Sequence, residues 1–141
     1  MQRTDFTFAH LLRVRFAEVD YQGVVFNAHY LTYLDTALTE YMRYLGMDVS
    51  LNANSKEFDF QLIKTTLEYK IPAKFDEEIE VAIRVKRIGN SSITFEAGVF
   101  NKANSALLVV GELVWVYTNL QLQKSVSIPA TVRSFFEKDL V

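Results

Sequence analysis

The segment from residue 27 to residue 45 places the strongest constraint on what this chain can fold into. Apolar residues recur there at spacings of three and four, which is the period of an α-helix. Further apolar side chains at Leu31, Met42 and Tyr44 widen the apolar surface well beyond one stripe. Such a helix, about five turns long, requires burial on several sides. We therefore expect a central helix, with Asn27 as its N-cap and Gly46 as its C-terminal stop.

The segments around this helix follow the two-residue period of β-strands. Strand-like alternation or continuous apolar character covers residues 10–18, 60–71, 79–86, 91–101 and 106–118. Turn signals lie at 72–76, 89–90 and 102–105, and Pro129 opens a short C-terminal helix. Because short turns favour antiparallel neighbours, the pattern predicts an α+β fold in which a curved antiparallel sheet of about five strands wraps the long helix. With 141 residues and no linker, the chain is expected to form one domain over 1–141.

Composition excludes several classes of function. The net charge is −2 and no long block of Lys and Arg occurs, which argues against nucleic acid as the main partner. The absence of cysteine rules out disulfides, thiolate catalysis and cysteine-based zinc sites, and two histidines are too few for a His-rich metal site. We expect no metal and no cofactor.

The apolar segments are too short for a membrane protein. The first residues lack the apolar core of a signal peptide, and no apolar run approaches the roughly 20 residues that span a bilayer. The sequence therefore predicts a cytoplasmic protein without membrane insertion.

Residues 107–117 offer apolar side chains to both faces of the predicted sheet. Antiparallel strands usually keep one face in water, so the outer face here is expected to be covered by another subunit. We predict a homo-oligomer, in which the lone charge Glu112 pairs across an interface.

The stretch "AEVDYQGVVFNAHYL" at 17–31 places one carboxylate, Asp20, shortly before the helix. The wider run 14–46 resembles the hot-dog-fold acyl-CoA thioesterases of the 4-hydroxybenzoyl-CoA thioesterase family. The matching residues are Asp20, Gly23, Val24, Val25, Phe26 and Tyr30. The strand pattern and the "RIGNSS" turn at 87–92 extend the resemblance over nearly the whole chain.

This resemblance implies a role for several residues. Asp20 would be the catalytic carboxylate, the backbone amide at Asn27 would polarise the thioester carbonyl, and Gly23 would allow a tight turn beneath the ligand. The acyl group would lie at a dimer interface partly lined by residues 60–66. The resemblance thus implies a homodimer at least, and favours a tetramer.

Two departures from many relatives concern the acyl pocket. Those relatives carry His at the position of Asn27 and Tyr at that of Phe16, whereas this chain has its histidine at His29. The acyl preference therefore does not transfer, and a CoA thioester and an acyl-carrier-protein thioester both stay open.

The predicted substrate site combines apolar and basic residues. The candidates around the acyl group are Val24, Phe26, Tyr30, Leu62 and Ile63. Those for the phosphates of coenzyme A are Lys64, Lys70, Arg84, Lys86 and Arg87, of which Lys64 and Arg87 are our choice. Arg87 could act together with the backbone donors of its turn.

Thioester hydrolysis needs only a carbonyl-binding donor and a carboxylate, because the acyl group is already activated. Asp20 could attack the carbonyl or take a proton from water, and the sequence leaves both roles open. No Gly-x-Ser-x-Gly elbow occurs, so hydrolysis would depend on Asp20. The main alternative is a non-catalytic acyl-CoA-binding module on the same fold. A hydratase is another, and it would need His29 as its acid or base.

Overall fold

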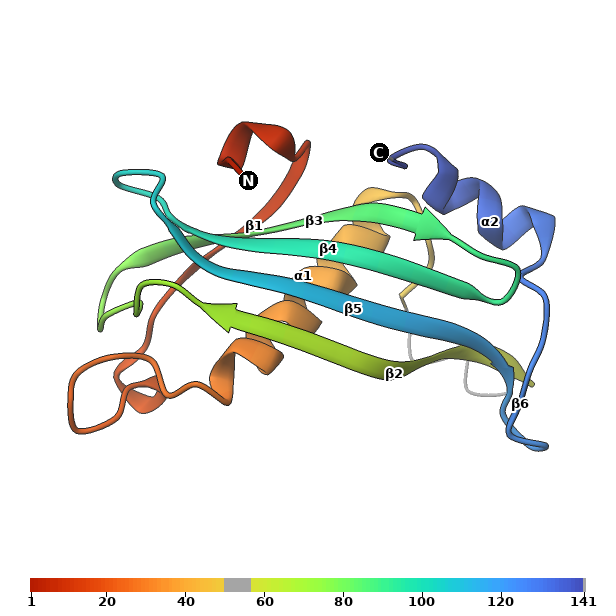
Figure 1. Cartoon of the computed structure of the whole chain (residues 1–141), viewed down its shortest axis with the longest axis horizontal. Helices are drawn as coiled ribbons and strands as arrows, with labels where there is room; N and C mark the ends of the chain where they lie inside the picture. Colours follow the sequence, from red (N-terminus) through yellow and green to blue (C-terminus); the bar gives the residue numbers. More distant parts are fainter. Residues whose placement is uncertain (50–56, 141) are drawn as a thin grey trace.

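The computed structural model describes residues 1–49 and 57–140, which form one curved sheet with two α-helices (Figure 1). The strands are β1 (Phe8–Arg13), β2 (Phe58–Tyr69), β3 (Glu78–Ile88), β4 (Ser92–Asn101), β5 (Leu107–Asn119) and β6 (Lys124–Ser125). The helices are α1 (His29–Tyr44) and α2 (Ala130–Glu137), with short 3₁₀ turns η1 (Arg3–Asp5) and η2 (Phe16–Glu18).

The sheet runs in the order β1-β3-β4-β5-β2, and every neighbouring pair is antiparallel. The sheet curves around α1, which lies behind it in Figure 1. The predicted arrangement of a curved antiparallel sheet around a central helix is thus confirmed. The last long strand, β5, lies between β4 and β2, so that β2 forms one edge of the sheet.

The first predicted strand was only partly right. The strand covers Phe8–Arg13, whereas Phe16–Glu18 forms a 3₁₀ turn. The Glu18 carboxylate accepts a hydrogen bond from the Arg15 amide at 2.8 Å, which closes the turn. A local side-chain contact therefore ends the extended conformation.

Helix α1 supplies the centre of the core. Its buried residues are Tyr30, Tyr33, Leu34, Ala37, Leu38 and Tyr41. They pack against the inward-facing side chains of β3 and β4, such as Val81 and Phe95. Gly46 ends the helix with a φ of +94°, as predicted for a C-terminal glycine.

The predicted N-cap was wrong. Ala28 occupies the N-cap position, and no side chain caps the helix there. The chain already turns before the helix, because the His29 amide donates to the Phe26 carbonyl at 2.9 Å. Asn27 therefore lies inside a turn, outside the helix proper.

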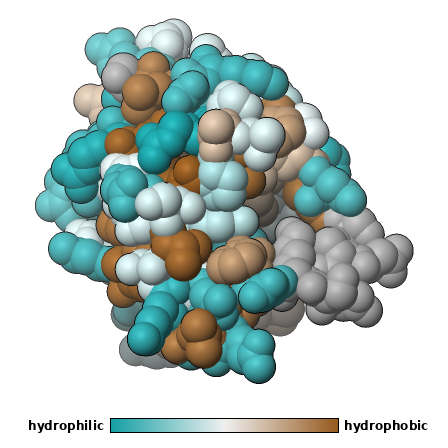
Figure 2. Space-filling view, turned by 90° about the vertical axis from the view of Figure 1, so that its right-hand side faces the viewer, coloured by the Kyte–Doolittle hydropathy of each residue, from teal (hydrophilic) through white to brown (hydrophobic). Residues whose placement is uncertain are grey.

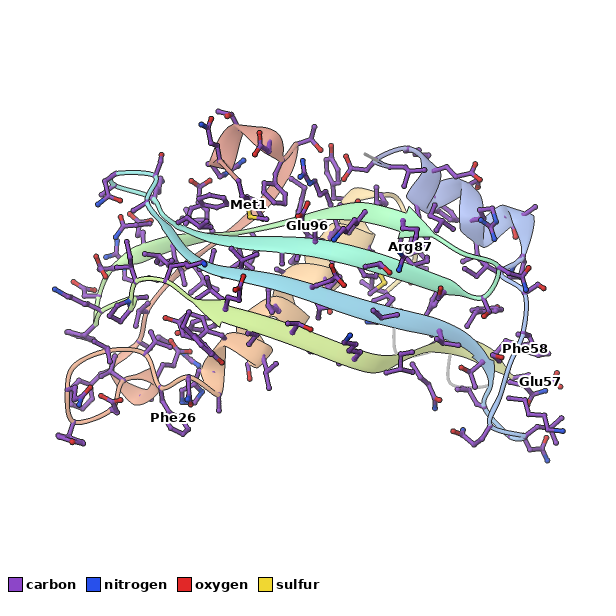
Figure 3. All side chains as sticks on the ribbon, viewed as in Figure 1. Met1, Phe26, Glu57, Phe58, Arg87 and Glu96 are labelled. Atoms are coloured by element: carbon purple, nitrogen blue, oxygen red, sulfur yellow. The ribbon has the colours of Figure 1, made fainter. Side chains whose placement is uncertain are left out.

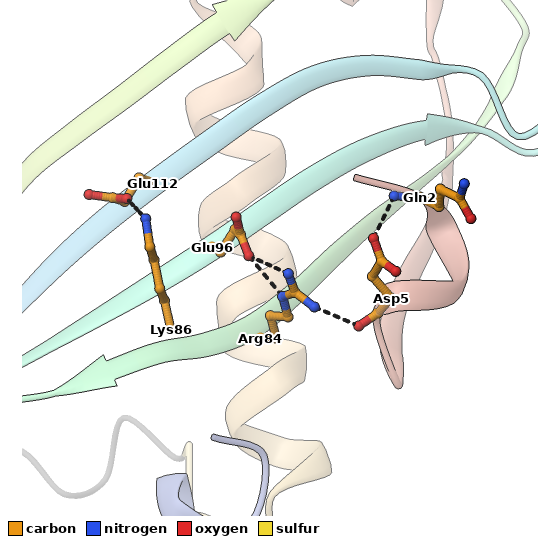
Figure 4. Close-up of polar contacts among 6 residues, drawn as sticks. All are labelled: Gln2, Asp5, Arg84, Lys86, Glu96 and Glu112. Carbon is orange, nitrogen blue, oxygen red and sulfur yellow. Dashed lines mark hydrogen bonds and ion pairs between the residues drawn. The ribbon is translucent and has the colours of Figure 1, made fainter. Parts of the chain in front are cut away.

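The outer face of the sheet is partly covered by the N-terminal segment. Phe6 is buried against Ala82 and Phe100, which together form a small second core. Arg84 holds this segment in place, since its guanidinium bonds to the Asp5 carbonyl at 2.9 Å and to Glu96 (Figure 4).

Glu112 also lies on the outer face, where it has a partner in its own chain. Its carboxylate is 2.7 Å from the Lys86 ammonium group, across β4 (Figure 4). The Lys86 contact holds the pKa of Glu112 below its usual value. The Glu112 charge therefore has a partner within its own chain. Its predicted pairing across an interface stays a prediction.

Helix α2 closes one end of the core. Phe136 is fully buried, and its ring centroid lies 5.8 Å from those of Phe60 and Phe95. Seen from that end, the surface carries separate apolar spots among polar residues, as Figure 2 shows. Among the residues described, no helix is long and apolar enough to cross a membrane.

Candidate active site

Asp20 lies in a small hairpin that covers residues 18–26. The Asp20 amide donates to the Val24 carbonyl, and the Gly23 amide donates to the Asp20 carbonyl, both at 2.9 Å. Gly23 has a φ of +77°, a conformation that glycine adopts without steric cost. The predicted role of Gly23 in a tight turn is consistent with this geometry.

The hairpin is fastened to the segment that follows β2. The Val25 amide donates to the Ala73 carbonyl at 2.9 Å, and the Phe75 amide donates to the Gly23 carbonyl at 3.1 Å. These bonds attach the Asp20 loop to the sheet.

The Asp20 carboxylate combines a local contact with a free oxygen. Its Oδ1 atom accepts a hydrogen bond from the Gln22 amide at 2.8 Å, which forms an Asx turn. Its Oδ2 atom accepts none from any residue described in the structure. Asp20 thus fixes its own loop and still has one carboxylate oxygen available.

Two backbone amides at the start of α1 are also available. Within residues 1–49 and 57–140, the amides of Asn27 and Ala28 donate to no protein acceptor. Unpaired amides and the positive end of the helix dipole favour a negative charge at such a position. This is the type of donor that an oxyanion hole requires.

Asp20 and Asn27 line one cavity of about 350 Å³. The predicted residues Val24, Phe26 and Tyr30 line it as well. The cavity is completed by Val25, Tyr69, Lys70, Ile71 and Pro72. One carboxylate, one helix terminus and several apolar walls therefore meet in the same space.

Five predicted substrate residues do not line this cavity within the described chain: Gly23, Leu62, Ile63, Lys64 and Arg87. Figure 3 shows Arg87 and Phe26 well apart along the long axis of the molecule. Leu62 and Ile63 instead lie on the edge strand β2, with 54% and 62% of their surface exposed. Their binding roles stay predictions.

Tyr69 is a cavity residue that the sequence did not reveal. Its hydroxyl donates to the Asn27 carbonyl at 3.4 Å, and its ring lies 5.6 Å from that of Tyr30. The Tyr30 hydroxyl accepts a hydrogen bond from the Ala73 amide at 3.2 Å, and burial raises its pKa. The only sequence signal for Tyr69 is its place at the strand end, just before Pro72.

The charged and titratable neighbours differ in their availability. Lys70 lines the cavity and lies 3.9 Å from the Glu68 carboxylate, whereas Arg84 and Lys86 pair with glutamates on the outer face of the sheet. His29 is not among the cavity residues, and its ring packs edge-on against Phe26 at 5.9 Å. Within the described residues, Lys70 is therefore the predicted cation closest to the chemistry.

The chain is similar to known proteins over most of its length. The thioesterase-like superfamily matches residues 14–136 of the chain. The chain is 26% identical over 129 residues to the acyl-CoA thioesterase YbgC of Haemophilus influenzae, covering 92% of this chain and 93% of that protein. It is 30% identical over 95 residues to a putative esterase of Aquifex aeolicus, covering 67% and 73%. The crystal structure of the PA5185 protein of Pseudomonas aeruginosa superposes with a TM-score of 0.86 at 25% identity, covering 99% of this chain and 95% of that one.

Proposed function

Because this chain belongs to the thioesterase-like superfamily and has the hot-dog fold, we propose that it hydrolyses acyl-CoA thioesters to the free acid and coenzyme A. The observation that carries the proposal is the shared cavity. It joins the Asp20 carboxylate to the start of α1, where, among the described residues, one carboxylate oxygen and two backbone amides have no hydrogen-bond partner. The similarity to the acyl-CoA thioesterase YbgC of Haemophilus influenzae supports the same reaction.

The two groups have complementary tasks in this reaction. Asp20 either attacks the thioester carbon or takes a proton from the water that attacks it. The carbonyl oxygen becomes negatively charged, and the Asn27 amide stabilises it by about 3 kcal/mol. The tetrahedral intermediate then collapses, the C–S bond breaks, and the thiolate leaves and takes up a proton. If water attacked, the free acid forms directly. If Asp20 attacked, an acyl anhydride on Asp20 forms first, and water then hydrolyses it to the free acid and the Asp20 carboxylate.

The walls of the cavity suggest how the substrate lies. Phe26, Tyr30 and Tyr69 would contact the acyl group, and Lys70 would meet a phosphate at the mouth of the site. Lys64 and Arg87 lie outside this cavity. They would bind the phosphates of coenzyme A only if the site of another subunit adjoined them, or if the coenzyme A extended along the sheet. A cytoplasmic location, where coenzyme A thioesters are available, stays a prediction.

The proposal is tested by thiol release from a panel of aromatic, short-chain and long-chain acyl-CoAs. We expect the wild-type protein to cleave at least one class with saturable kinetics. The preferred class would then define the acyl group. Binding of acyl-CoA without thiol release would contradict the proposed hydrolysis. It would favour a non-catalytic acyl-CoA-binding module.

We also propose that the chain is at least a homodimer, formed along the free edge of β2. This edge strand is twelve residues long and, within the described part of the chain, pairs with β5 on one side only. A long unpaired edge with exposed apolar side chains readily pairs with another strand. A second copy there would bring residues 60–66 of each chain to the interface, and a tetramer would then join two such dimers.

Ile63→Asp is expected to convert the oligomer into monomers, because it places a charge in the middle of this edge. Leu11→Asp is the matched control on the opposite edge strand, β1, where Leu11 is 44% exposed. Sedimentation velocity of both variants and of the wild type checks the prediction. A monomeric wild type, or an unchanged Ile63→Asp oligomer, would contradict a dimer built on β2.

A further inference from the structure

We propose that Glu18 is a positioning residue, which holds the Asp20 loop in place against the helix amides through its hydrogen bond with Tyr33. The proposal rests on the proposed function, since it names what fixes the distance between the two catalytic groups. Glu18 lies two residues before Asp20, and Tyr33 lies on α1, one turn beyond Tyr30.

The Glu18 carboxylate accepts four hydrogen bonds within the protein. Its Oε1 atom accepts from the Tyr33 hydroxyl at 2.9 Å and from the Arg15 amide at 2.8 Å. Its Oε2 atom accepts two bonds from the Arg15 guanidinium, at 3.0 and 3.1 Å. Only 8% of Glu18 and 3% of Tyr33 are exposed, so the bond between them is shielded from water.

The backbone of Glu18 connects the Asp20 hairpin to the start of α1, where the Asn27 amide lies. The Phe26 amide donates to the Glu18 carbonyl at 3.0 Å, which closes the base of the Asp20 hairpin. Phe26 directly precedes Asn27, whose amide is the proposed donor. A displacement of Glu18 would therefore move both Asp20 and the start of α1.

The hydrogen bonds from Arg15 and Tyr33 favour the ionised form of Glu18. Burial alone would raise the pKa of Glu18, but hydrogen bonds from Arg15 and Tyr33 outweigh it and lower the pKa below its ordinary value. Burial and the bond to Glu18 raise the pKa of Tyr33, so its hydroxyl keeps its proton and stays a donor. A charged acceptor with a neutral donor gives a strong and directional bond.

The same helix carries a matched control. The buried Tyr41 hydroxyl donates to the Asp139 carboxylate at 2.6 Å, near the opposite end of α1. Tyr33→Phe and Tyr41→Phe each remove one buried hydroxyl that binds a carboxylate. A purely structural role predicts the same kind of effect for both, whereas a positioning role predicts a loss of activity for Tyr33→Phe alone.

Steady-state thiol release should show this difference. We expect Tyr33→Phe to lower kcat by about tenfold with KM changed by less than about twofold, because misplacement affects the chemical step more than binding. Tyr41→Phe should keep kcat within about twofold of the wild type. Equal kcat values for the two variants would overturn the proposal.

Glu18→Gln separates positioning from catalysis by Glu18 itself. The amide oxygen still accepts from Tyr33, so the variant should keep more activity than Tyr33→Phe. Its pH–rate profile should retain the acid limb, because that limb would report Asp20. Loss of the acid limb would make Glu18 the base and overturn a positioning role.

Hydrogen exchange gives a readout that does not depend on activity. Tyr33→Phe should speed amide exchange in residues 17–28, whereas Tyr41→Phe should leave it unchanged. A wild type that cleaves no thioester would refute the proposed function, and exchange would still decide whether Tyr33 holds this loop. Unchanged exchange in Tyr33→Phe would overturn the inference by itself.

Discussion

Asp20→Asn is expected to lower kcat for thioester hydrolysis by at least about 100-fold in a protein that stays folded. The substitution removes the charge needed for attack or for proton transfer. It keeps the shape of the loop, because the asparagine Oδ1 atom can still accept the hydrogen bond from the Gln22 amide. Binding of acyl-CoA should change little, since most cavity residues are untouched.

The matched control for this variant is Asp76→Asn. Asp76 is exposed, lies outside the cavity and has a φ of +68°, which asparagine tolerates. Thiol release and melting temperature should be measured for both variants. An Asp20→Asn protein that keeps more than about a tenth of the wild-type kcat would refute a catalytic Asp20.

Isotopically labelled water would separate the two roles of Asp20. If Asp20 attacks the thioester, an acyl anhydride forms, and its hydrolysis can place the label on the Asp20 carboxylate. If Asp20 is the general base, the label enters only the released acid. Labelled Asp20, seen by peptide mass after turnover, would therefore identify the nucleophile.

Phe136→Ala is expected to lower the free energy of unfolding by about 3–5 kcal/mol. The phenyl ring is fully buried and packs edge-on against Phe60 and Phe95. The cavity left behind would adjoin the inner face of the sheet. Because hydrogen bonds hold the strands in place, they cannot move inward to fill it, and the full cost of the cavity is retained. Denaturant unfolding measures the change.

Phe135→Ala is the control for Phe136→Ala, because it removes the same side chain from the same helix. Phe135 is only partly buried, at the margin of the core. Its loss should cost clearly less, about 1–2 kcal/mol. Equal losses for the two variants would show that α2 contributes through helix formation and not through the buried ring.

The sequence predicted the fold well where periodicity is strong. The helix period in 27–45 and the alternation in the later strands gave the main elements, and the observed helix is His29–Tyr44. The start of α1 was misplaced because Asn27 has the side chain of an N-cap but lies in a turn. The first strand, predicted over 10–18, ends at Arg13. Glu18 closes a 3₁₀ turn by accepting a hydrogen bond from the Arg15 amide, and hydrophobic periodicity does not predict such a contact.

The candidate site was predictable only where its residues are close in sequence. Asp20, Val24, Phe26, Asn27 and Tyr30 all come from one short run, and all line the cavity. Tyr69 ends β2 and Lys70 follows it. The sequence offered Lys70 as a candidate cation, but the place of both residues beside Asp20 depends on how the sheet folds back against α1. Glu18 gave no signal of its own, because its partner Tyr33 is fifteen residues away.

The strand order has a consequence for the way the chain leaves the ribosome. Among the strands that the structure describes, β2 pairs with β5 alone, and β5 is synthesised about forty residues later. During that interval a twelve-residue strand with exposed Leu62 and Ile63 has no neighbour on either side. Because unpaired strands with exposed apolar side chains are prone to aggregation, a translation pause between β2 and β5 would prolong a vulnerable state of the nascent chain.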